Sequence, residues 1–530
     1  MLTSAAVLAL LAGALGLVYI LTIPGRRAKT LPPGPPTLPV IGNIHQIPLK
    51  KTYIQFSKWA KQYGDIYSLK VASGTTVVIS KRRLVKEIMD KQSSLSSSRP
   101  VAYAVDKLVY KGDFLLLMNS NDPRFRAGRK LFHQFFMESM VEKKHLPFIN
   151  AEATQLMRDL LVDPANFMLH AKRYANSFIM SATYGIRTPD IQTPHFKQIN
   201  HIGEHMTELV MPGALPPVDI FGFLHYVPER FLDHWKSRCL EMQKASDALY
   251  GHLMELVMER RRKRGPKETF ADQIVDQQDK LGFSWHEMLY MTGVVLDAGT
   301  ETTANVWIIL VQMLTSRPEL LRQVQEQIDA VVGEDRTPTW DDFPKLPIVN
   351  QLMKEVQRFR PVVPIAFPHR LTEAVQVDGY TLPKDTTIVV NLAGLHYDDA
   401  KFANAHDFDP NNYIGKPGLA SEYANVADYE LRDHYGYGFG RRLCPGIHLA
   451  ERSLFVTFAK LLWGFDVGPA EDASGGLLIP DYDLVSGYTD GAVVVPQKFE
   501  CSIQVRSEKR KSTILRELAE AERTIFSHFD

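Results

Sequence analysis

The residue best placed to do chemistry is Cys444, in the segment Tyr-Gly-Phe-Gly-Arg-Arg-Leu-Cys-Pro-Gly at 437–446. A lone intracellular cysteine is most often a small buried hydrophobe, but its neighbours here favour another role. The glycines let the backbone wrap closely around a bound group, and Pro445 suits the first turn of a helix. A thiolate at a helix N-terminus beside Arg441 and Arg442 is electrostatically stabilised. The segment predicts a thiolate metal ligand.

A second set of chemical residues is Ala-Gly-Thr-Glu-Thr-Thr at 298–303, in the middle of a long apolar run. Gly299 lowers helix stability by about 1 kcal/mol relative to alanine, and Glu301 is expensive to bury without a partner. Something must compensate for both. The plainest alternative is a kinked core helix in which the threonine bonds to its own backbone.

A third pair is Glu355 and Arg358, between Pro347 and Pro361. On a helix, side chains at i and i+3 meet, so the two can form an ion pair. Such pairs are common on solvated helix faces, and the pattern means little by itself.

The elements that must carry these residues are mainly helices. Ser284 and Glu287 have capping-box spacing and Arg317-Pro318 ends the run, which predicts a helix about 45 Å long. Its centre is apolar on every side, which predicts a buried central helix. Residues 66–71 and 76–80 predict a hairpin with Gly74 at positive φ, and 386–392 predict a further strand.

The two ends of the chain differ from the body. Residues 5–23 are apolar and span about 28 Å as a helix, and the first charges follow this run rather than precede it. This order predicts an uncleaved anchor over residues 1–25, with the body in the cytosol, rather than a cleaved signal peptide. Residues 26–40 are predicted to be a basic, proline-rich hinge, 41–505 the catalytic domain and 506–530 a charged tail that is a surface helix or partly disordered.

The composition narrows the partners. Lysine plus arginine total 61 and aspartate plus glutamate 60, so a net charge of +1 gives no field that favours nucleic acid. Three scattered cysteines exclude a disulfide framework and a cysteine-rich zinc site, and they indicate a reducing compartment.

Taken in order, the three motifs resemble those of cytochrome P450 monooxygenases. The loop at Cys444 is similar to Phe-x-x-Gly-x-Arg-x-Cys-x-Gly with Tyr437 in place of phenylalanine, and the other two motifs precede it in the family's order. The resemblance implies a mainly α fold with small β-sheets, preceded by a transmembrane helix. The nearest likeness is to fungal enzymes of secondary metabolism, including mycotoxin pathways, such as the O-methylsterigmatocystin oxidoreductase type.

The resemblance also implies roles for individual residues. Cys444 becomes the axial ligand of haem b beside Tyr437, while Glu301 and Thr302 organise proton delivery to O2. Glu355 and Arg358 become a structural lock whose third member is Asn412 where the family has arginine. Arg129, Arg442 and His369 become the residues that contact the haem propionates, and Arg370 is the alternative to His369. A phenylalanine, Phe125, replaces the tryptophan that the family places near Arg129. Substrate contacts fall to Ala298, Val362, Phe367 and Tyr488.

The implied partners are an NADPH-dependent reductase, which docks at Arg126, Lys130 and Arg441, and a lipophilic substrate that enters from membrane lipid past residues 211–218. The implied location is the endoplasmic reticulum membrane, crossed once, with the catalytic domain facing the cytosol. Two alternatives remain: a haem-thiolate isomerase or dehydratase that needs no reductase, and a haem- or lipid-binding protein without catalysis. The Glu301 and Thr302 pair favours oxygen activation over both.

Overall fold

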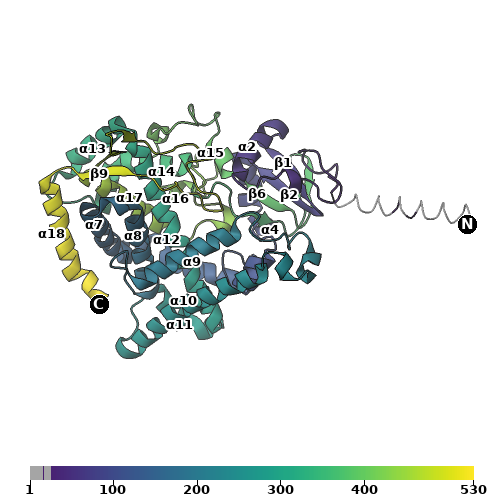
Figure 1. The fold of residues 1–530 in the computed structure, drawn as a ribbon, viewed down its shortest axis with the longest axis horizontal. Coiled ribbons are helices and arrows are strands. Elements are labelled where there is room, and N and C mark those ends of the chain that lie inside the picture. Colours follow the sequence, from purple (N-terminus) through teal and green to yellow (C-terminus); the bar gives the residue numbers. More distant parts are fainter. Residues whose placement is uncertain (1–12, 14–15, 17–24, 530) are drawn as a thin grey trace, which may run out of the picture.

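Helix α12 (Trp285–Thr315) runs through the middle of the molecule (Figure 1), in a computed structural model that describes residues 13, 16 and 25–529. Its start is the predicted capping box: the Ser284 hydroxyl accepts the Glu287 N–H at 3.2 Å, and the Glu287 carboxylate accepts the Ser284 N–H at 2.7 Å. These bonds satisfy donors that a helix N-terminus leaves free. The helix ends at Thr315, shortly before Pro318.

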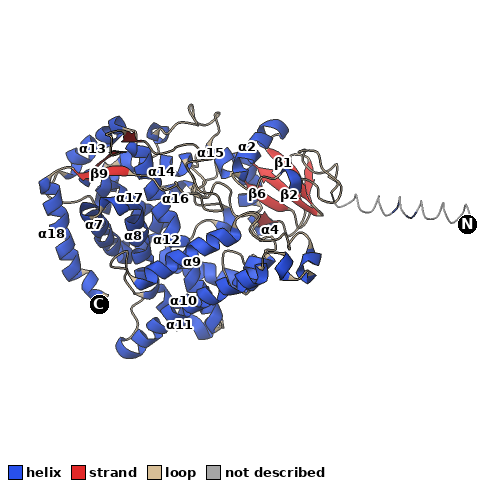
Figure 2. Ribbon diagram, in the orientation of Figure 1, coloured by secondary structure: helices blue, strands red, loops and turns tan. Residues whose placement is uncertain are grey.

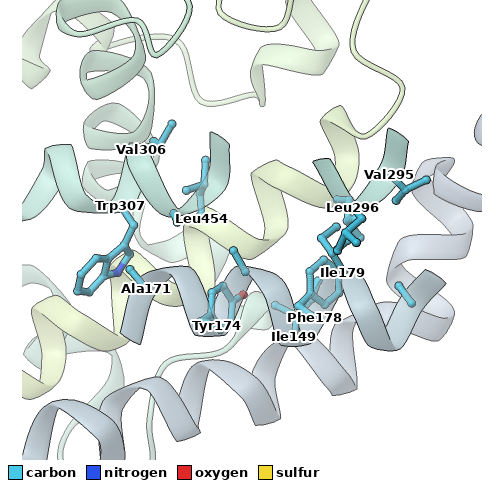
Figure 3. Packing of buried hydrophobic residues seen from close by; sticks show 14 of the residues in the cluster. Ile149, Ala171, Tyr174, Phe178, Ile179, Val295, Leu296, Val306, Trp307 and Leu454 are labelled. Carbon is cyan, nitrogen blue, oxygen red and sulfur yellow. The ribbon is translucent and has the colours of Figure 1, made fainter. Parts of the chain in front are cut away.

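The core forms around α12. Helix α8 (Phe167–Tyr184) packs along it, and α7 (Leu146–Val162) and α17 (Ile447–Gly464) complete the packing. Figure 3 shows Phe178 and Ile179 of α8 beside Leu296, and Trp307 near Ala171. On either side of its polar centre, α12 carries mostly apolar residues around its whole circumference. Burial of every face, rather than of one apolar stripe, therefore holds the helix in place.

The remaining helices surround this core (Figure 2), and the predicted helix-dominated fold is confirmed. The longer ones are α2 (Thr52–Tyr63), α5 (Pro123–Phe136), α9 (Pro194–Val210), α10 (Trp235–Arg264), α11 (Phe270–Leu281), α13 (Pro318–Val332), α14 (Pro347–Phe359) and α18 (Glu508–Thr524). The short ones are α3 (Arg82–Leu84), α4 (Ser93–Ser96), α6 (Glu138–Met140), α15 (Leu392–His396) and α16 (Ala420–Tyr423). Brief π or 3₁₀ segments are η1 (Ile44–Gln46), η2 (Val85–Lys91), η3 (Tyr103–Val109), η4 (Val141–His145), η5 (Pro164–Asn166), η6 (Gly222–Tyr226), η7 (Glu229–Phe231), η8 (Trp340–Lys345), η9 (Pro410–Tyr413), η10 (Gly440–Arg442) and η11 (Phe526–His528).

Within the described residues, three small sheets complete the fold. The largest has the order β1-β2-β6-β3, in which β2 and β6 are parallel and the other neighbours antiparallel. A two-stranded sheet pairs β4 with β5, and a third has the order β8-β7-β9. The strands are β1 (Ile66–Val71), β2 (Gly74–Ile79), β3 (His369–Arg370), β4 (Val375–Val377), β5 (Tyr380–Leu382), β6 (Thr387–Val390), β7 (Phe465–Glu471), β8 (Leu477–Leu478) and β9 (Cys501–Val505).

The first hairpin forms where the sequence predicts it, but its turn differs. Val71 pairs with Gly74, so the turn is Ala72-Ser73, and the positive φ of 52° falls on Ala72. Gly74 is the first residue of β2 instead. The prediction gave the positive φ to glycine because glycine adopts it without strain; the tight two-residue connection imposes it on alanine.

The proline-rich segment predicted as a hinge lies against β1. Ser68 donates its hydroxyl to the Pro32 carbonyl at 2.6 Å and its N–H to the Pro33 carbonyl at 2.8 Å. Arg27 donates to the Pro35 carbonyl at 2.7 Å and to the Ser68 carbonyl at 3.0 Å. Prolines lack N–H donors but keep their carbonyls, so they can cap the free edge of β1.

The predicted membrane anchor lies almost entirely outside the described residues. Within the part of the chain that the structure describes, one helix is long and apolar enough to cross a membrane, and it is α12. Most of that helix is buried in the protein, as the central helix of a core is.

The end of the chain folds into helix α18, whose N-terminus is capped by the Ser507 hydroxyl. One face is charged and exposed, while Ile514, Leu518 and Ala521 pack against α7 and the β9 region. In Figure 1, α18 lies at the edge of the molecule opposite the first sheet. The segment predicted as a charged tail is therefore an ordered part of the core boundary.

Substitutions on the two faces of α18 test this packing. Ile514 is fully buried and lies against Gly464, whereas its neighbour Leu515 is 45% exposed. We expect Ile514→Ala to lower the free energy of unfolding by about 2–4 kcal/mol, because it leaves a cavity. Leu515→Ala, the matched control, should change it by less than about 0.5 kcal/mol. Urea unfolding of the full chain measures both, and equal effects would contradict the packing.

Candidate active site

Cys444 lies in a tight loop between η10 and α17. Its N–H donates to the Tyr437 carbonyl at 2.8 Å, which closes the loop, and Gly446 is the N-cap residue of α17. Gly440 has a φ of 54°, and a Cβ there would collide with the Met89 carbonyl. Only glycine fits that position, so the loop geometry depends on it.

The thiol of Cys444 is half-buried and not part of a disulfide. Burial raises the pKa of the thiol, while the Gly446 N–H and the nearby Arg129 guanidinium act to lower it. These two groups favour the thiolate, as expected of a cysteine at a helix N-terminus. The Gly446 N–H and Arg129 thus offset part of the desolvation that burial imposes on the charged sulfur.

Three arginines surround the loop. Arg442 donates to the Ser97 carbonyl at 2.9 Å, Arg129 to the Leu443 carbonyl at 2.7 Å, and Arg99 to the Leu116 carbonyl at 2.9 Å. The Arg442 guanidinium also stacks on Phe125, 3.9 Å from the ring centroid. The aromatic ring that replaces tryptophan therefore still supports the arginine.

The three guanidinium groups carry unbalanced charge. Among the described residues none of them has an ion-pair partner, although all three are at least partly buried. Desolvation lowers the pKa of Arg442 to about 8 and that of Arg99 to about 10, and Arg99 and Arg129 further depress Arg442. Such a cluster is stabilised by an anionic ligand, and carboxylates suit guanidinium groups best.

His369 is buried next to this cluster. Its Nδ1 donates to the Ser96 carbonyl at 2.7 Å, because a carbonyl can only accept. Desolvation and Arg99 hold the pKa of the ring well below its ordinary value, so the ring is neutral and Nε2 is an acceptor. It can meet a carboxylate only as an imidazolium. Arg370 is paired with Asp385 at 2.7 Å.

The Glu355 and Arg358 pair is fully buried on α14. Arg358 donates to the two carboxylate oxygens at 2.6 and 2.7 Å and to the carbonyls of His396, Ala405 and Asp407 at 3.0, 2.7 and 2.8 Å. Asn412 donates to both Glu355 oxygens at 3.4 Å. These longer bonds stand where the family has an arginine.

The hydroxyl of Tyr437 has a partner. Gln357 of α14 donates to it at 3.3 Å, and the ring of His434 lies 5.6 Å away. Burial raises the pKa of Tyr437 well above its ordinary value, so the hydroxyl stays protonated. The hydroxyl group that distinguishes Tyr437 from phenylalanine is thus hydrogen-bonded within the fold.

The middle of α12 has small and polar residues between its buried flanks. A Cβ on Gly299 would lie 2.5 Å from Ile179 of α8, so the glycine permits the close approach of the two helices. Glu301 pairs with Lys172 of α8 at 3.5 Å, and Thr302 donates to the Ala298 carbonyl at 2.8 Å. Lys172 is therefore the oppositely charged partner that the sequence analysis expected Glu301 to need.

The four predicted substrate residues lie in different settings. Ala298 is exposed within α12, and Phe367 is half-buried beside the Arg99 guanidinium. Val362 is buried and its carbonyl accepts the Val494 N–H at 2.8 Å. The Tyr488 hydroxyl donates to Gln312 at 2.6 Å, and the ring lines a cavity of about 10 Å³ that is too small for a substrate.

Comparison with known proteins identifies the family to which the chain belongs. The family model for cytochrome P450 matches residues 32–476. The chain belongs to the cytochrome P450 family. It is 45% identical over 509 residues to cytochrome P450 monooxygenase macC of Penicillium terrestre, with 95% of each chain covered, and 44% identical over 509 residues to yanC of Aspergillus niger, again with 95% of each covered.

A solved structure shows the same P450 fold. A solved structure of a zebra fish cytochrome P450 with abiraterone superposes with a TM-score of 0.69 and 21% sequence identity. The alignment covers 86% of this chain and all of the other. The enzyme is therefore a P450 monooxygenase of the haem-thiolate class, and the thiol of Cys444 with the unpaired arginines fits a haem with its two carboxylates.

Two residues of the P450 site were not singled out from the sequence. Arg99, in Ser-Arg-Pro at 98–100, belongs to no motif, and only the fold brings it to Arg442. Lys172 lies on a different helix from Glu301. The only signal for Lys172 was that a buried glutamate needs a partner, which gives no position.

The supporting lock can be tested by removing its members one at a time. Arg358→Ala leaves Glu355 and three carbonyls without partners, so we expect the free energy of unfolding to fall by about 3–5 kcal/mol. Asn412→Ala removes only two long hydrogen bonds and should lower it by about 0.5–1.5 kcal/mol. Denaturant unfolding and the amount of haem retained measure both. A larger loss for Asn412→Ala would show that the asparagine carries the lock.

Proposed function

We propose that this P450 binds haem b through Cys444 and oxidises a lipophilic small molecule in fungal secondary metabolism. The observation that carries the proposal is the half-buried Cys444 just before α17, next to three at least partly buried arginines that lack acidic partners among the described residues. Arg99, Arg129 and Arg442 would hold the two propionates, and Tyr437 would pack beside the ring. The haem, when bound, supplies oxygen activation and oxidising power.

Proton delivery falls to Glu301 and Thr302. Glu301 is half-exposed and its bond to Lys172 is long at 3.5 Å, so the carboxylate can leave this pair and turn toward water. The Thr302 hydroxyl has its donor engaged by the Ala298 carbonyl and keeps its acceptor sites free. An acid next to a hydroxyl can pass protons inward during turnover. An isomerase has no need of this pair.

Electrons would come from an NADPH-dependent flavoprotein reductase. Arg126 and Lys130 of α5 and Arg441 of η10 are exposed on elements that also carry Arg129 and Arg442. A depression of about 370 Å³ adjoins Arg441 and is lined by Lys86, Asp90, Lys91, Ser93, Asn425 and Gly440. A basic face of this kind suits an acidic docking surface.

Membrane attachment would bring a lipophilic substrate to the site. Residues 211–231 expose several large apolar side chains: Phe223 is 65% exposed, Tyr226 90% and Phe231 66%. Exposed apolar side chains that gather in one segment suit a membrane surface. With the predicted anchor at 1–25, they support a single-pass protein of the endoplasmic reticulum. We expect alkaline carbonate to leave the protein in the membrane fraction; its release would contradict the anchor.

Spectra and turnover test the function. The reduced carbon monoxide complex of the full-length protein should show the absorbance of a thiolate-ligated haem, and Cys444→Ala should lose it while keeping its fold. Oxidation of lipophilic metabolites should depend on NADPH and added reductase. Turnover without either would favour an isomerase or dehydratase. A Cys444→Ala protein that kept the thiolate-type spectrum would falsify the ligand assignment.

A matched variant in the same experiment separates oxygen activation from haem binding. Thr302→Ala should retain the carbon monoxide spectrum, because it does not touch the thiolate, yet release more hydrogen peroxide per NADPH consumed. Thr303→Ala, one residue along the helix, is the control and should behave as the wild type.

A further inference from the structure

Two histidines lie one turn apart on the exposed side of helix α9. His201 and His205 belong to the segment His-Ile-Gly-Glu-His at 201–205, and both are exposed. Their ring centroids are 4.2 Å apart, and the ring planes meet at 50°. Side chains at i and i+4 of a helix are neighbours, so the backbone itself holds the two imidazoles together. The P450 chemistry described above uses neither ring.

Two imidazoles at this spacing can chelate a metal ion. Histidine is the commonest metal ligand in proteins, and one class of zinc enzymes binds its metal through a helical His-x-x-Glu-His segment. At a metal–nitrogen distance of about 2.0 Å, two histidine rings on one metal have centroids about 4.5 Å apart at a 90° angle and about 5 Å apart at a tetrahedral angle. The observed 4.2 Å is close to the first value. Exposed side chains rotate freely enough to make up the difference.

Acidic side chains adjoin the pair. Glu204 directly precedes His205, and Glu208 follows it by three residues on the same side of the helix; both are exposed. Their negative charge favours a cation over an anion at this surface. No three histidine, cysteine, aspartate or glutamate side chains are placed together to hold a metal anywhere in the part of the chain that the structure describes. The pair therefore supplies two ligands and leaves the other positions to water.

The opposite side of α9 lies against the protein. Ile202 and Leu209 are buried, and a Cβ on Gly203, midway between the two histidines, would lie 3.6 Å from the Glu301 Oε1 atom of α12. Metal binding on the outer side thus acts on a helix whose inner side adjoins Glu301. A metal bound to both histidines closes a ring over one turn of α9, so it opposes unwinding of that turn.

We propose that His201 and His205 form a reversible binding site for a divalent transition-metal ion of the Zn²⁺, Ni²⁺ and Cu²⁺ class, and that the bound metal stabilises α9. Imidazole suits all three ions, and the order of affinity places Cu²⁺ above Zn²⁺ and Ni²⁺. With only two protein ligands, the site exchanges its metal with solution instead of holding it permanently. This inference does not depend on the proposed function.

Metal titration tests the site. The full-length protein is used without an affinity tag, because a histidine tag would bind the same ions. ZnCl₂ and CuCl₂ are titrated separately and binding is measured by calorimetry. His201→Gln and His205→Gln should each weaken the tightest site by at least about 10-fold, because a single imidazole forms no chelate. The matched control is His45→Gln, which replaces an exposed histidine outside α9 and should leave the site unchanged.

Hydrogen exchange tests the effect on the helix. With free Zn²⁺ at 100 times its Kd, amide exchange in residues 201–210 should slow by about 10- to 100-fold, because opening of the helix must first release the metal. The same Zn²⁺ concentration should leave the exchange of these residues unchanged in His205→Gln. Amides of α18 serve as an internal control and should not respond in either protein.

Three outcomes overturn the inference: a wild type that binds neither ion, a tightest site that survives both substitutions, and metal binding that leaves the exchange of α9 unchanged. Both substituted side chains are exposed, so the variants should fold as the wild type does. Circular dichroism of each variant without metal checks this, and a variant with the wild-type spectrum that has lost the site attributes the binding to the histidine pair.

Discussion

The buried Arg358 guanidinium fixes the part of the chain that carries the cysteine. It joins Glu355 on α14 to the His396 carbonyl at 3.0 Å. The His396 ring then accepts the Tyr435 N–H at 2.9 Å, and Tyr437, two residues on, accepts the Cys444 N–H. Hydrogen bonds and short stretches of chain thus link the ion pair to the cysteine loop. The bonds of Arg358 to Glu355 and His396 and the bond of the His396 ring are buried, so the loss of any one leaves an unpaired polar group and not merely a weaker contact.

A buried ion pair is a poor source of stability by itself, because desolvation offsets most of the attraction. Here its value lies in geometry. The segment between α15 and η10 has little regular structure, so its carbonyls find partners outside helices and sheets. Arg358 offers donors in a fixed planar fork and satisfies two of those carbonyls, of Ala405 and Asp407, together with that of His396 at the end of α15. The pair therefore adds directional bonds to the apolar cluster of Phe402, Ala405 and Tyr413 in the same segment.

The sequence predicted the elements whose signals are local. The ends of α12 follow from Ser284, Glu287 and Pro318, because capping and proline geometry act within a few residues. The Cys444 loop was recognisable because its glycines and arginines are adjacent. The proline-rich segment docks on β1, and α18 packs against the core, through surfaces that lie far away in sequence. Composition alone therefore predicted only a stiff hinge for the first segment and a charged tail for the second. Arg99 was missed for the same reason.

The site separates charge of opposite sign. Arg99, Arg129 and Arg442 gather around the cysteine loop, while Asp297 and Glu301 lie on α12. The arginines suit the carboxylates of a haem, and a thiolate among cations is stabilised as a ligand. Glu301 is paired with Lys172 of α8, and neither acid forms an ion pair with these arginines among the described residues. The proposed cofactor would therefore meet cations at its carboxylates, and the proposed proton path would begin at an acid that those cations do not neutralise.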